Sequence, residues 1–575
     1  MFLFDFFRSF LPLHNPIGFG AADFVELALA VLLVALVLAR ARFEAVARRF
    51  AERTGWCMLL LAVLPVALRL ALLAPSPVPT PGGSDDFSYL LLGDTLRHLR
   101  LANPAHQLHQ FFEANFVLQE PSYSSIFPPG QGIALALGWI LFGHPWAGVM
   151  FSVAALCSLC YWMLRGWTTP GWALVGGLLA ACEFGPLNYW MNSYWGGAVS
   201  GIAGCLIFGA LGRLAEPRDR PGMPVHYCRV PSAAAVCLGL GFALQWLTRP
   251  FECVVLALCG VAFFLPRWRV LVKIAPVAAL AFLPGAALTL LQNHAVTGSW
   301  TTLPYELSRY QYGVPTTFTF QPNPVPHRQL TSEQQLGYEA QAAVHGAGHD
   351  SVSRFLGRLG IRAGFYRFFF YVPLYLALPA FLLSLREFRF AWVLGTVVLV
   401  ALGDNFYPYF YPHYVAALTC VFVLIAVTAL ERLGRLQVRG VAIGQDAARL
   451  VVFLCAAHFL FWYGLHSTRQ PQIARATAEY ETWDYINSGD PGGRIAINRR
   501  LDEAPGKQLV FVRYFPQHMF HEWIYNAADI DGARVVRALD LGPDENEKLL
   551  RYFPDRTVWL LEPDAIPPRL RPYPR

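Results

Sequence analysis

Charged side chains are scarce in this chain of 575 residues. Only 14% of the residues are Asp, Glu, Lys or Arg, whereas 55% are hydrophobic, and the mean hydropathy is +0.39. This composition excludes an ordinary soluble domain, in which roughly a quarter of the residues are charged. The chain is therefore predicted to be a membrane protein that crosses the bilayer many times.

Three further absences narrow the class of protein. Segments 292–365 and 466–575 contain no cysteine, and the 11 Cys lie within or beside apolar runs, so no disulfide framework is predicted. The opening MFLFDFFRSFLPLHNP lacks a basic n-region and a cleavage site. We therefore expect residues 1–20 to form an interfacial segment that stays attached. No internal repeat is visible, which weighs against transporter folds built from inverted halves.

Apolar runs of about 15 to 22 residues recur along most of the chain, and each has the length that a helix needs to cross ~30 Å of hydrocarbon. The sequence thus predicts an all-α polytopic membrane protein with about 12 or 13 transmembrane helices over residues 21–465. The predicted spans are 21–39, 57–74, 129–143, 147–164, 171–187, 196–212, 231–248, 251–265, 271–290, 366–384, 390–403, 412–430 and 450–465.

Arginine placement predicts the orientation of these helices, because cytoplasmic loops of membrane proteins are enriched in Lys and Arg. The Arg-rich loops are 40–56, 213–230, 385–389 and 431–449. The loops 75–127 and 292–365, the turn 404–411 and the tail 466–575 are then predicted to lie on the outer side of the membrane. Four apolar runs lie between loops 75–127 and 213–230, although the number of crossings there must be odd. Either GIALALGWILFG or one of the two runs around EFGPLNYWMNSYWGG is therefore expected not to span.

The tail, 466–575, is predicted to be a small periplasmic α/β domain. LVFVRYF, ARVVRALDLG and TVWLLEP have the β-branched and aromatic content of short buried strands, and DENEKLLRYFP is typical of a helix. The segment contains no Gly-rich phosphate loop. We therefore expect a docking or gating module.

The stretch SDDFSY at 84–89, followed by the Pro-rich entry FPPGQGIALALGWILFG, resembles the GT-C glycosyltransferases. It is most similar to the glycosyltransferase family 39-like group, which contains the protein mannosyltransferases and the aminoarabinose transferase of lipid A. The resemblance covers about residues 57–430 and is clearest over 84–145.

The resemblance implies a membrane enzyme that moves a sugar from a polyprenyl-phosphate donor to an acceptor on the outer face of a bacterial inner membrane. The acceptor would be a lipid, a polysaccharide or a protein, and no nucleic acid is expected as a partner. No cofactor is implied, although some enzymes of this kind use a divalent cation.

The resemblance assigns the role of general base to Asp85 or Asp86. A hydroxyl or amine that attacks an anomeric carbon must lose a proton, and a carboxylate at the membrane surface suits that task. Two adjacent acids also disfavour simultaneous ionisation, which raises the pKa of one of them. The alternative is that Ser84, Asp85 or Asp86 caps the following helix, and one acid can cap while the other acts as base.

Arg249 is the principal candidate for binding the lipid phosphate. In LTRPFE it resembles the family's basic-then-proline motif, although Arg stands where Lys-Gly is common. The alternatives are that Arg249 reaches the headgroups or pairs with Glu252.

Other candidate substrate-binding residues lie at the same outer boundary. An intramembrane charge such as Arg69 is a functional candidate by default. Asp404 would complete an acidic face opposite Asp85, and His413 would contact the phosphate or the acceptor. The complete set of candidates is Tyr89, Arg69, Arg249, Asp404 and His413.

His345 and His349 have the i, i+4 spacing of a weak metal motif, but Gly346 and Gly348 argue against a helix there, so no metal site is predicted. Two functions of other classes stay open. A transporter or flippase of lipid-linked sugars would place charges deep within helices, and a non-catalytic scaffold would use the tail domain to bind an envelope partner.

Overall fold

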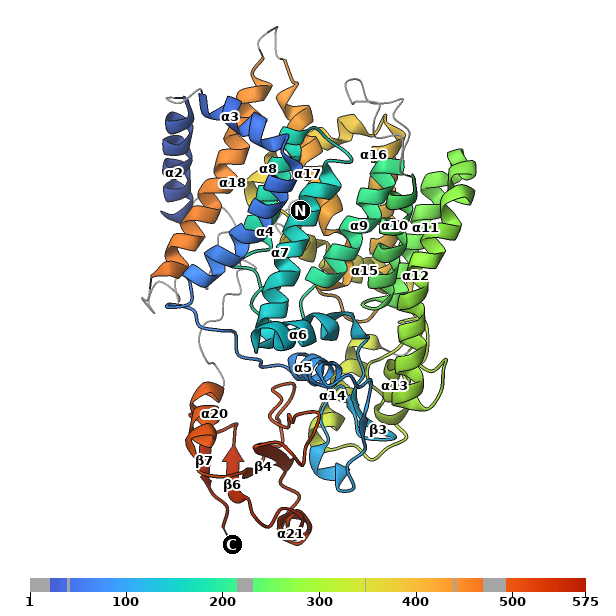
Figure 1. Ribbon diagram of the computed structural model, residues 1–575, viewed down its shortest axis with the longest axis vertical. Helices are drawn as coiled ribbons and strands as arrows, with labels where there is room; N and C mark the ends of the chain where they lie inside the picture. Colours follow the sequence, from blue (N-terminus) through green and yellow to red (C-terminus); the bar gives the residue numbers. More distant parts are fainter. Residues whose placement is uncertain are drawn as a thin grey trace.

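A computed structural model of the chain describes residues 21–38, 42–214, 231–346, 348–437, 440, 442–468 and 493–574. Figure 1 shows a bundle of helices with a smaller domain, built from the C-terminal part of the chain, below it. The segment 1–20, expected to be interfacial, lies outside the described residues.

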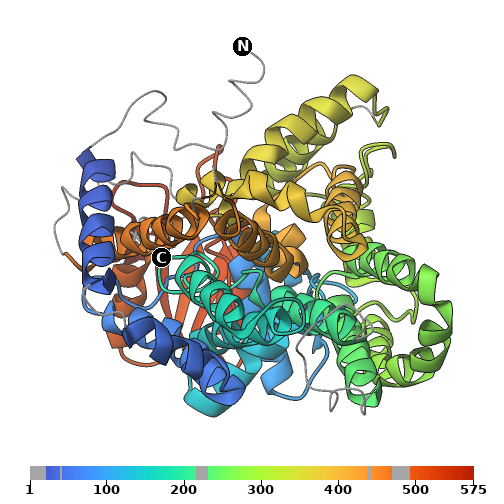
Figure 2. The ribbon, with the colours of Figure 1, turned by 90° about the horizontal axis from the view of Figure 1, so that it is seen from above.

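The long helices of the bundle run roughly along the vertical axis of Figure 1. They are α2 (Ala21–Leu38), α4 (Thr54–Ala71), α7 (Pro145–Leu164), α8 (Pro170–Glu183), α9 (Ala198–Leu214), α10 (Pro231–Trp246), α11 (Pro250–Phe264), α12 (Trp268–Thr297), α16 (Phe388–Asp404), α17 (Thr419–Gly434) and α18 (Gly444–Ser467). Figure 2, seen from above, shows α2 beside α18 at one edge and α10, α11 and α12 at the other.

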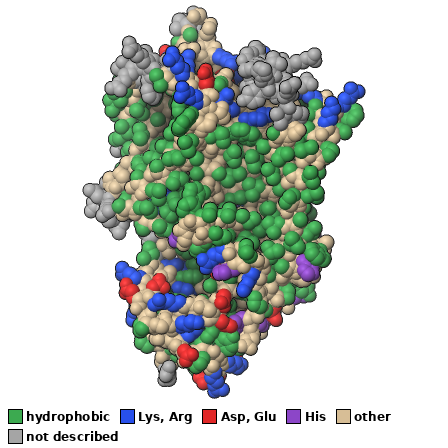
Figure 3. Space-filling view, viewed as in Figure 1, with side chains coloured by type: hydrophobic (Ala, Val, Ile, Leu, Met, Phe, Trp, Pro, Cys, Tyr) green, Lys and Arg blue, Asp and Glu red, His purple; other side chains and the backbone are tan. Residues whose placement is uncertain are grey.

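An apolar band surrounds the bundle, and charged side chains gather above and below it in Figure 3. Five described segments are long and apolar enough to cross a membrane, namely Thr54–Ala71, Pro145–Leu164, Pro250–Thr297, Pro412–Gly434 and Gly444–Ser467. The predicted class, an all-α polytopic membrane protein with a small C-terminal α/β domain, is confirmed.

The helix α6 (Pro129–Phe142) lies across the end of the bundle that is nearer the C-terminal domain, and not along the bundle (Figure 1). Its Leu137, Ile140 and Leu141 are more than half exposed, as suits a helix at the edge of the hydrocarbon. The helices α7, α8 and α9 instead run along the bundle (Figure 1). This arrangement agrees with the expectation that one of the four runs, here GIALALGWILFG, does not span.

The described residues of the Arg-rich loops fall at the end of the bundle opposite to α6. The helix α3 (Arg42–Ala51) lies there, as do the end of α9 and the connections before α16 and after α17 (Figure 1). The 3-10 turn η4 (Leu265–Arg267) joins α11 to α12 at the same end. The arginines thus mark one face of the bundle, and the outer loops mark the other.

The expectation of a continuous membrane helix over 366–384 is wrong. The chain forms three 3-10 segments there, η5 (Gly364–Phe369), η6 (Val372–Leu376) and η7 (Leu378–Ser384). Pro373 and Pro379 explain the breaks, because each lacks an amide hydrogen and each sits at the start of a 3-10 segment.

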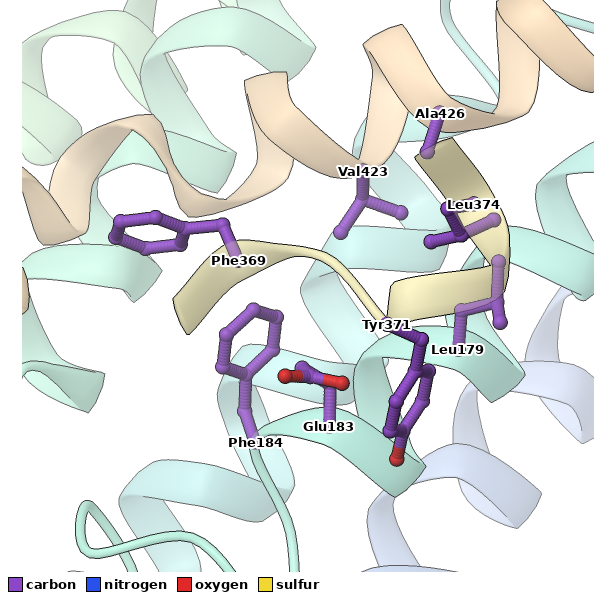
Figure 4. A pocket seen from close by; sticks show the side chains of 8 residues that line it. All are labelled: Leu179, Glu183, Phe184, Phe369, Tyr371, Leu374, Val423 and Ala426. Atoms are coloured by element: carbon purple, nitrogen blue, oxygen red, sulfur yellow. The ribbon is translucent and has the colours of Figure 1, made fainter. Parts of the chain in front are cut away.

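Figure 4 shows a void between η5, η6, α8 and α17, lined by Glu183, Phe184, Tyr371 and their neighbours. Its volume of about 10 Å³ leaves room for one water molecule. No candidate site residue lines it.

The outer loops form a layer between the bundle and the C-terminal domain. This layer contains α5 (Ser84–Arg97), η1 (His109–Phe112), α13 (Pro304–Tyr312), α14 (Ser332–His345) and the strands β1 (Asn103–Pro104), β2 (Val117–Leu118) and β3 (Ser122–Ser125). Two further elements pack against the bundle itself, namely α15 (Val352–Ala363) at the end of α16 and η8 (Pro412–Leu418) beside α9. The strands pair antiparallel in the order β1-β3-β2. Figure 1 shows α5 directly below α6 and above the C-terminal domain.

The C-terminal domain is a four-stranded sheet with the order β5-β4-β6-β7. Its elements are α20 (Arg494–Glu503), β4 (Gln508–Val512), β5 (Val535–Leu539), α21 (Pro543–Tyr552), β6 (Thr557–Glu562) and β7 (Arg569–Pro572). β4 pairs parallel with β5 and β6, and β7 pairs antiparallel with β6. The core around Phe511 also contains Leu91, Phe111 and Phe112 of the first outer loop. The domain therefore shares a hydrophobic core with the outer layer.

The glycine of the FPPG motif sets the position of α6. The Gly130 amide donates to the Leu247 carbonyl oxygen at 2.7 Å. A Cβ on Gly130 would lie 2.4 Å from Cγ2 of Thr248. Only a residue without a side chain lets α6 begin against the segment that precedes Arg249.

Gly130→Ala is therefore expected to lower the free energy of unfolding by about 1–3 kcal/mol, because the new methyl group overpacks this contact. Gly171→Ala is the matched control, since Gly171 also follows the first proline of a helix but has open space around its Cα. The measurement is thermal unfolding of both variants in detergent, followed by tryptophan fluorescence. Equal melting temperatures for the two variants would contradict the close approach.

Candidate active site

Asp86 holds the start of α5 against the bundle. Its Oδ1 accepts a hydrogen bond from the Tyr194 amide at 2.9 Å, and its Oδ2 accepts one from the Gly82 amide at 3.1 Å. The side chain is 8% exposed. An acid at the third helical position that accepts from an amide before the helix acts as a capping residue. Asp86 therefore has the structural role that the sequence left open for either acid.

Asp85 points elsewhere and its carboxyl accepts no hydrogen bond from another residue in the described part of the chain. It is half-buried and lies within electrostatic range of Arg249. Burial, together with the neighbouring Asp86 charge, raises the pKa of the Asp85 carboxyl to about 7, against the opposing effect of Arg249. Asp85 is thus the acid that remains available for proton transfer near neutral pH.

Arg249 is the cation of the site, and it precedes the first residue of α11. Pro250 suits that helical start, because its missing amide hydrogen has no partner there in any case. The Arg249 guanidinium lies 4.2 Å from the centre of the Tyr414 ring and 3.7 Å from a carboxylate oxygen of Glu252. The alternative of an ion pair with Glu252 is therefore present in the structure.

Five tyrosines from four segments of the chain lie within electrostatic range of Arg249. They are Tyr89, Tyr189, Tyr305, Tyr407 and Tyr414. Their hydroxyls are both donors and acceptors, so they can hydrogen-bond phosphate or sugar oxygens around the cation.

Tyr89 connects the two motifs of the first outer loop. Its ring stacks on Phe127, the aromatic residue of FPPG, with ring centres 4.3 Å apart. Tyr89 follows Asp85 by four residues on α5, so both lie on one face of that helix. Phe127 directly precedes α6, so the contact of α6 with the segment before Arg249 also fixes the position of Tyr89 beside Arg249.

Asp404 adds a second buried acid to the site. Its side chain is 1% exposed, and neither carboxylate oxygen has a hydrogen-bond partner among the described residues. It interacts electrostatically with Arg249, Glu252 and Arg362. Arg362 donates to the backbone oxygen of Asp404 at 2.7 Å, which holds the end of α16 near the site.

His413 also lies in this region. Its Nδ1 is 3.3 Å from the Tyr189 hydroxyl, and its ring packs edge-on against Trp195 with centres 4.9 Å apart. His413 lies within electrostatic range of Arg249 as well. The structure thus brings Tyr89, Asp404 and His413 together around Arg249.

Arg69 is placed differently. It is fully buried, and its nitrogens donate to Oδ1 of Asn192 at 2.7 Å, to the Ser76 carbonyl at 3.0 Å and to the Pro77 carbonyl at 2.9 Å. Its guanidinium also lies over the Trp146 ring. These contacts give Arg69 a structural role at the end of α4.

Sequence reasoning gave no role to Tyr189, Tyr305 or Tyr407. The signals were the aromatic density of PLNYWMNSYW, of LPYELSRYQY and of GDNFYPYFYPHY. Aromatic belts at membrane boundaries produce the same density, so composition alone did not separate site tyrosines from anchors.

In the part of the chain that the structure describes, no group of three or more His, Cys, Asp or Glu side chains is arranged to hold a metal ion. His345 instead places Nε2 3.0 Å from the Phe318 carbonyl oxygen.

Comparisons with known proteins place the fold. No protein-family model matches the chain, and no curated protein sequence matches it significantly. Among solved structures, ArnT from Cupriavidus metallidurans bound to undecaprenyl phosphate superposes with a TM-score of 0.50 at 13% identity, over 88% of this chain and 93% of ArnT. The chain therefore has the GT-C fold, as the resemblance implied.

The archaeal oligosaccharyltransferase AglB from Archaeoglobus fulgidus, in complex with an inhibitory peptide and a dolichol-phosphate, is also similar. It gives a TM-score of 0.41 at 12% identity, over 88% of this chain and 69% of AglB.

The two acids are expected to respond oppositely to amidation. The raised pKa of Asp85 means that wild-type stability is fully present below the ordinary Asp pKa of about 4 and is lost as pH rises through about 7. Asp85→Asn should therefore be more stable than wild type at pH 8, and by a larger margin than at pH 5. Asp86→Asn should be less stable by about 1–3 kcal/mol, because an amide accepts through only one oxygen.

Denaturant unfolding of both variants in detergent at pH 5 and pH 8 tests this division of roles. A greater loss of stability for Asp85→Asn than for Asp86→Asn would show that the roles are reversed.

Proposed function

We propose that the chain is a membrane glycosyltransferase that moves a sugar from a polyprenyl-phosphate donor to an acceptor at the outer face of a bacterial inner membrane. The observation that carries this proposal is the pairing of an available carboxylate, Asp85, with a partly buried cation, Arg249, at one end of a GT-C fold. The C-terminal domain lies on the periplasmic side, opposite to the Arg-rich loops.

The donor phosphate would bind at Arg249. The guanidinium and the amides at the start of α11 offer a cation and a helix N-terminus to an anion. The tyrosines around Arg249 add hydroxyl donors to the phosphate oxygens. ArnT, which shares the fold, was crystallised with undecaprenyl phosphate, and this agrees with a lipid phosphate as the ligand here.

A cavity between α9, α10, α11 and α12 supports a lipid-linked donor. Its volume is about 370 Å³, within the range of small-molecule sites, and apolar side chains line it almost entirely. Trp246 and Cys253 belong to its lining, and each lies within about one helical turn of Arg249 in the sequence. A prenyl tail in this cavity would leave its phosphate at Arg249.

The reaction follows from the two charges. Asp85 accepts the proton of an acceptor hydroxyl or amine as that oxygen or nitrogen bonds to the anomeric carbon of the sugar. The bond between the anomeric carbon and the phosphate oxygen breaks, and the polyprenyl phosphate leaves with the bonding electrons. Arg249 stabilises the charge on the leaving phosphate. A single displacement inverts the configuration of the anomeric carbon.

A transporter or flippase of lipid-linked sugars is the second candidate function, and a non-catalytic envelope scaffold is the third. The enzyme is favoured because Asp85 and Arg249 lie at the end of the bundle and not within a path through it.

Asp85→Asn is expected to lower sugar transfer by about 10²–10⁴-fold, the usual contribution of a general base. The measurement is transfer or hydrolysis of radiolabelled sugar from a panel of polyprenyl-phosphate sugars by the purified protein in nanodiscs. Asp446→Asn, at an exposed acid of α18 on the opposite end of the bundle, is the control and should keep full activity. If no donor is consumed, or if Asp85→Asn matches wild type, the transporter and scaffold become the leading candidates.

Arg249→Gln is expected to weaken binding of undecaprenyl phosphate about tenfold to hundredfold, because a charge-assisted contact to the phosphate is lost. The control is Arg269→Gln, which removes an arginine near the start of α12 at the opposite end of the bundle. Lipid titrations of both variants in nanodiscs give the comparison. Unchanged affinity for Arg249→Gln would remove Arg249 from the donor site.

A further inference from the structure

One face of α5 rests on the C-terminal domain. Ser84 Oγ donates to the Phe520 carbonyl at 3.5 Å, and Phe87 stacks on Tyr525 with ring centres 4.1 Å apart. Leu91 enters the core of the C-terminal domain, and Asp94 Oδ2 accepts from the Ala528 amide at 2.7 Å. The four α5 residues are spaced at three or four positions, so they form a single helical stripe.

Arg494 of the C-terminal domain holds the Phe87 ring in one position. The guanidinium of this buried arginine lies 4.8 Å from the Phe87 ring centre, 4.0 Å from that of Trp523 and 5.2 Å from that of Tyr525. It also donates to the Glu522 carbonyl oxygen at 2.7 Å. A cation held among three aromatic rings fixes the position of each ring, and desolvation strengthens such contacts.

The opposite face of α5 rests on the membrane part of the chain. Tyr89 stacks on Phe127, and Leu92 packs on Gly132 of α6, where a Cβ would come within 2.5 Å of the Leu92 side chain. Asp85 lies on the Tyr89 side, toward Arg249. The helix is thus held between two bodies, and Asp85 projects from the face that the C-terminal domain does not touch.

We infer that the C-terminal domain positions Asp85, with Arg494 and Tyr525 as positioning residues that act through Phe87. A 14-residue helix is marginal in isolation, so contacts with the rest of the protein fix where its first turn lies. A displacement of about 1 Å is enough to reduce a reaction rate about 100-fold. The part of this inference that concerns the reaction rate rests on the proposed function. The part that concerns the mechanical link, by which the C-terminal domain holds α5 in place, does not.

The experiment measures amide hydrogen exchange of residues 84–97 and compares wild type with variants, each as the full chain in nanodiscs. Tyr525→Ala removes the stack and should accelerate exchange in α5 by about tenfold or more, while the bundle helices keep their protection. Tyr525→Phe keeps the ring and should restore the wild-type rate. Phe87→Leu breaks the same contact from the α5 side and should reproduce the effect if Tyr525→Ala folds poorly.

Arg500→Ala is the matched control. Arg500 stacks on Trp559 and donates to the Leu570 carbonyl, both within the C-terminal domain, and has no contact with α5. Its loss should leave exchange in 84–97 unchanged. Equal acceleration by Arg500→Ala and Tyr525→Ala, or no acceleration by Tyr525→Ala and Phe87→Leu, would overturn the inference.

Kinetics provide the second measurement, with the polyprenyl-phosphate sugar that the wild type consumes. Tyr525→Ala should lower kcat about tenfold to hundredfold and change KM less than about twofold, because the donor site at Arg249 is untouched. An unchanged kcat in a variant whose α5 exchanges faster would contradict the claim that the position of α5 controls the reaction rate. If the wild type consumes no donor, the proposed function fails while the exchange result still decides the mechanical link.

Discussion

The hydrogen bonds that Asp86 accepts from the Gly82 and Tyr194 amides are the constraint on which the site depends. They join the first turn of α5 to the segment between α8 and α9, 108 residues along the chain. Because Asp86 is used in this way, its neighbour Asp85 is directed away from those amides and toward Arg249. An adjacent pair of acids thus separates into a capping residue and an available carboxylate.

The remainder of the site is assembled from short contacts that converge on the same helix. Gly130 lets α6 begin against Leu247 and Thr248, which brings Phe127 under Tyr89 and places both beside Arg249. The C-terminal domain holds the other face of α5 through Phe87. The geometry of the candidate site is therefore shared by the bundle, the outer layer and the C-terminal domain, none of which forms it alone.

Local sequence patterns predicted the fold class, the strands of the tail and the existence of an apolar run that fails to span, because hydropathy and period are local signals. They also named Asp85, Asp86 and Arg249. They did not decide between the two acids, because that choice depends on the amide of Tyr194. The prediction of a helix over 366–384 was wrong, because the segment is apolar enough for a membrane helix but contains prolines that interrupt one. The tyrosines around Arg249 come from four segments, and only the folded chain brings them together.

The most direct test of the account is the pKa of the Asp85 carboxyl itself. Infrared difference spectra of the full chain across pH 4–9, with Asp85→Asn to assign the band, measure that pKa. Burial and the Asp86 charge predict a midpoint near 7, with the carboxyl protonated below it and ionised above it. A midpoint near 4, the value of an ordinary exposed aspartate, would contradict the account.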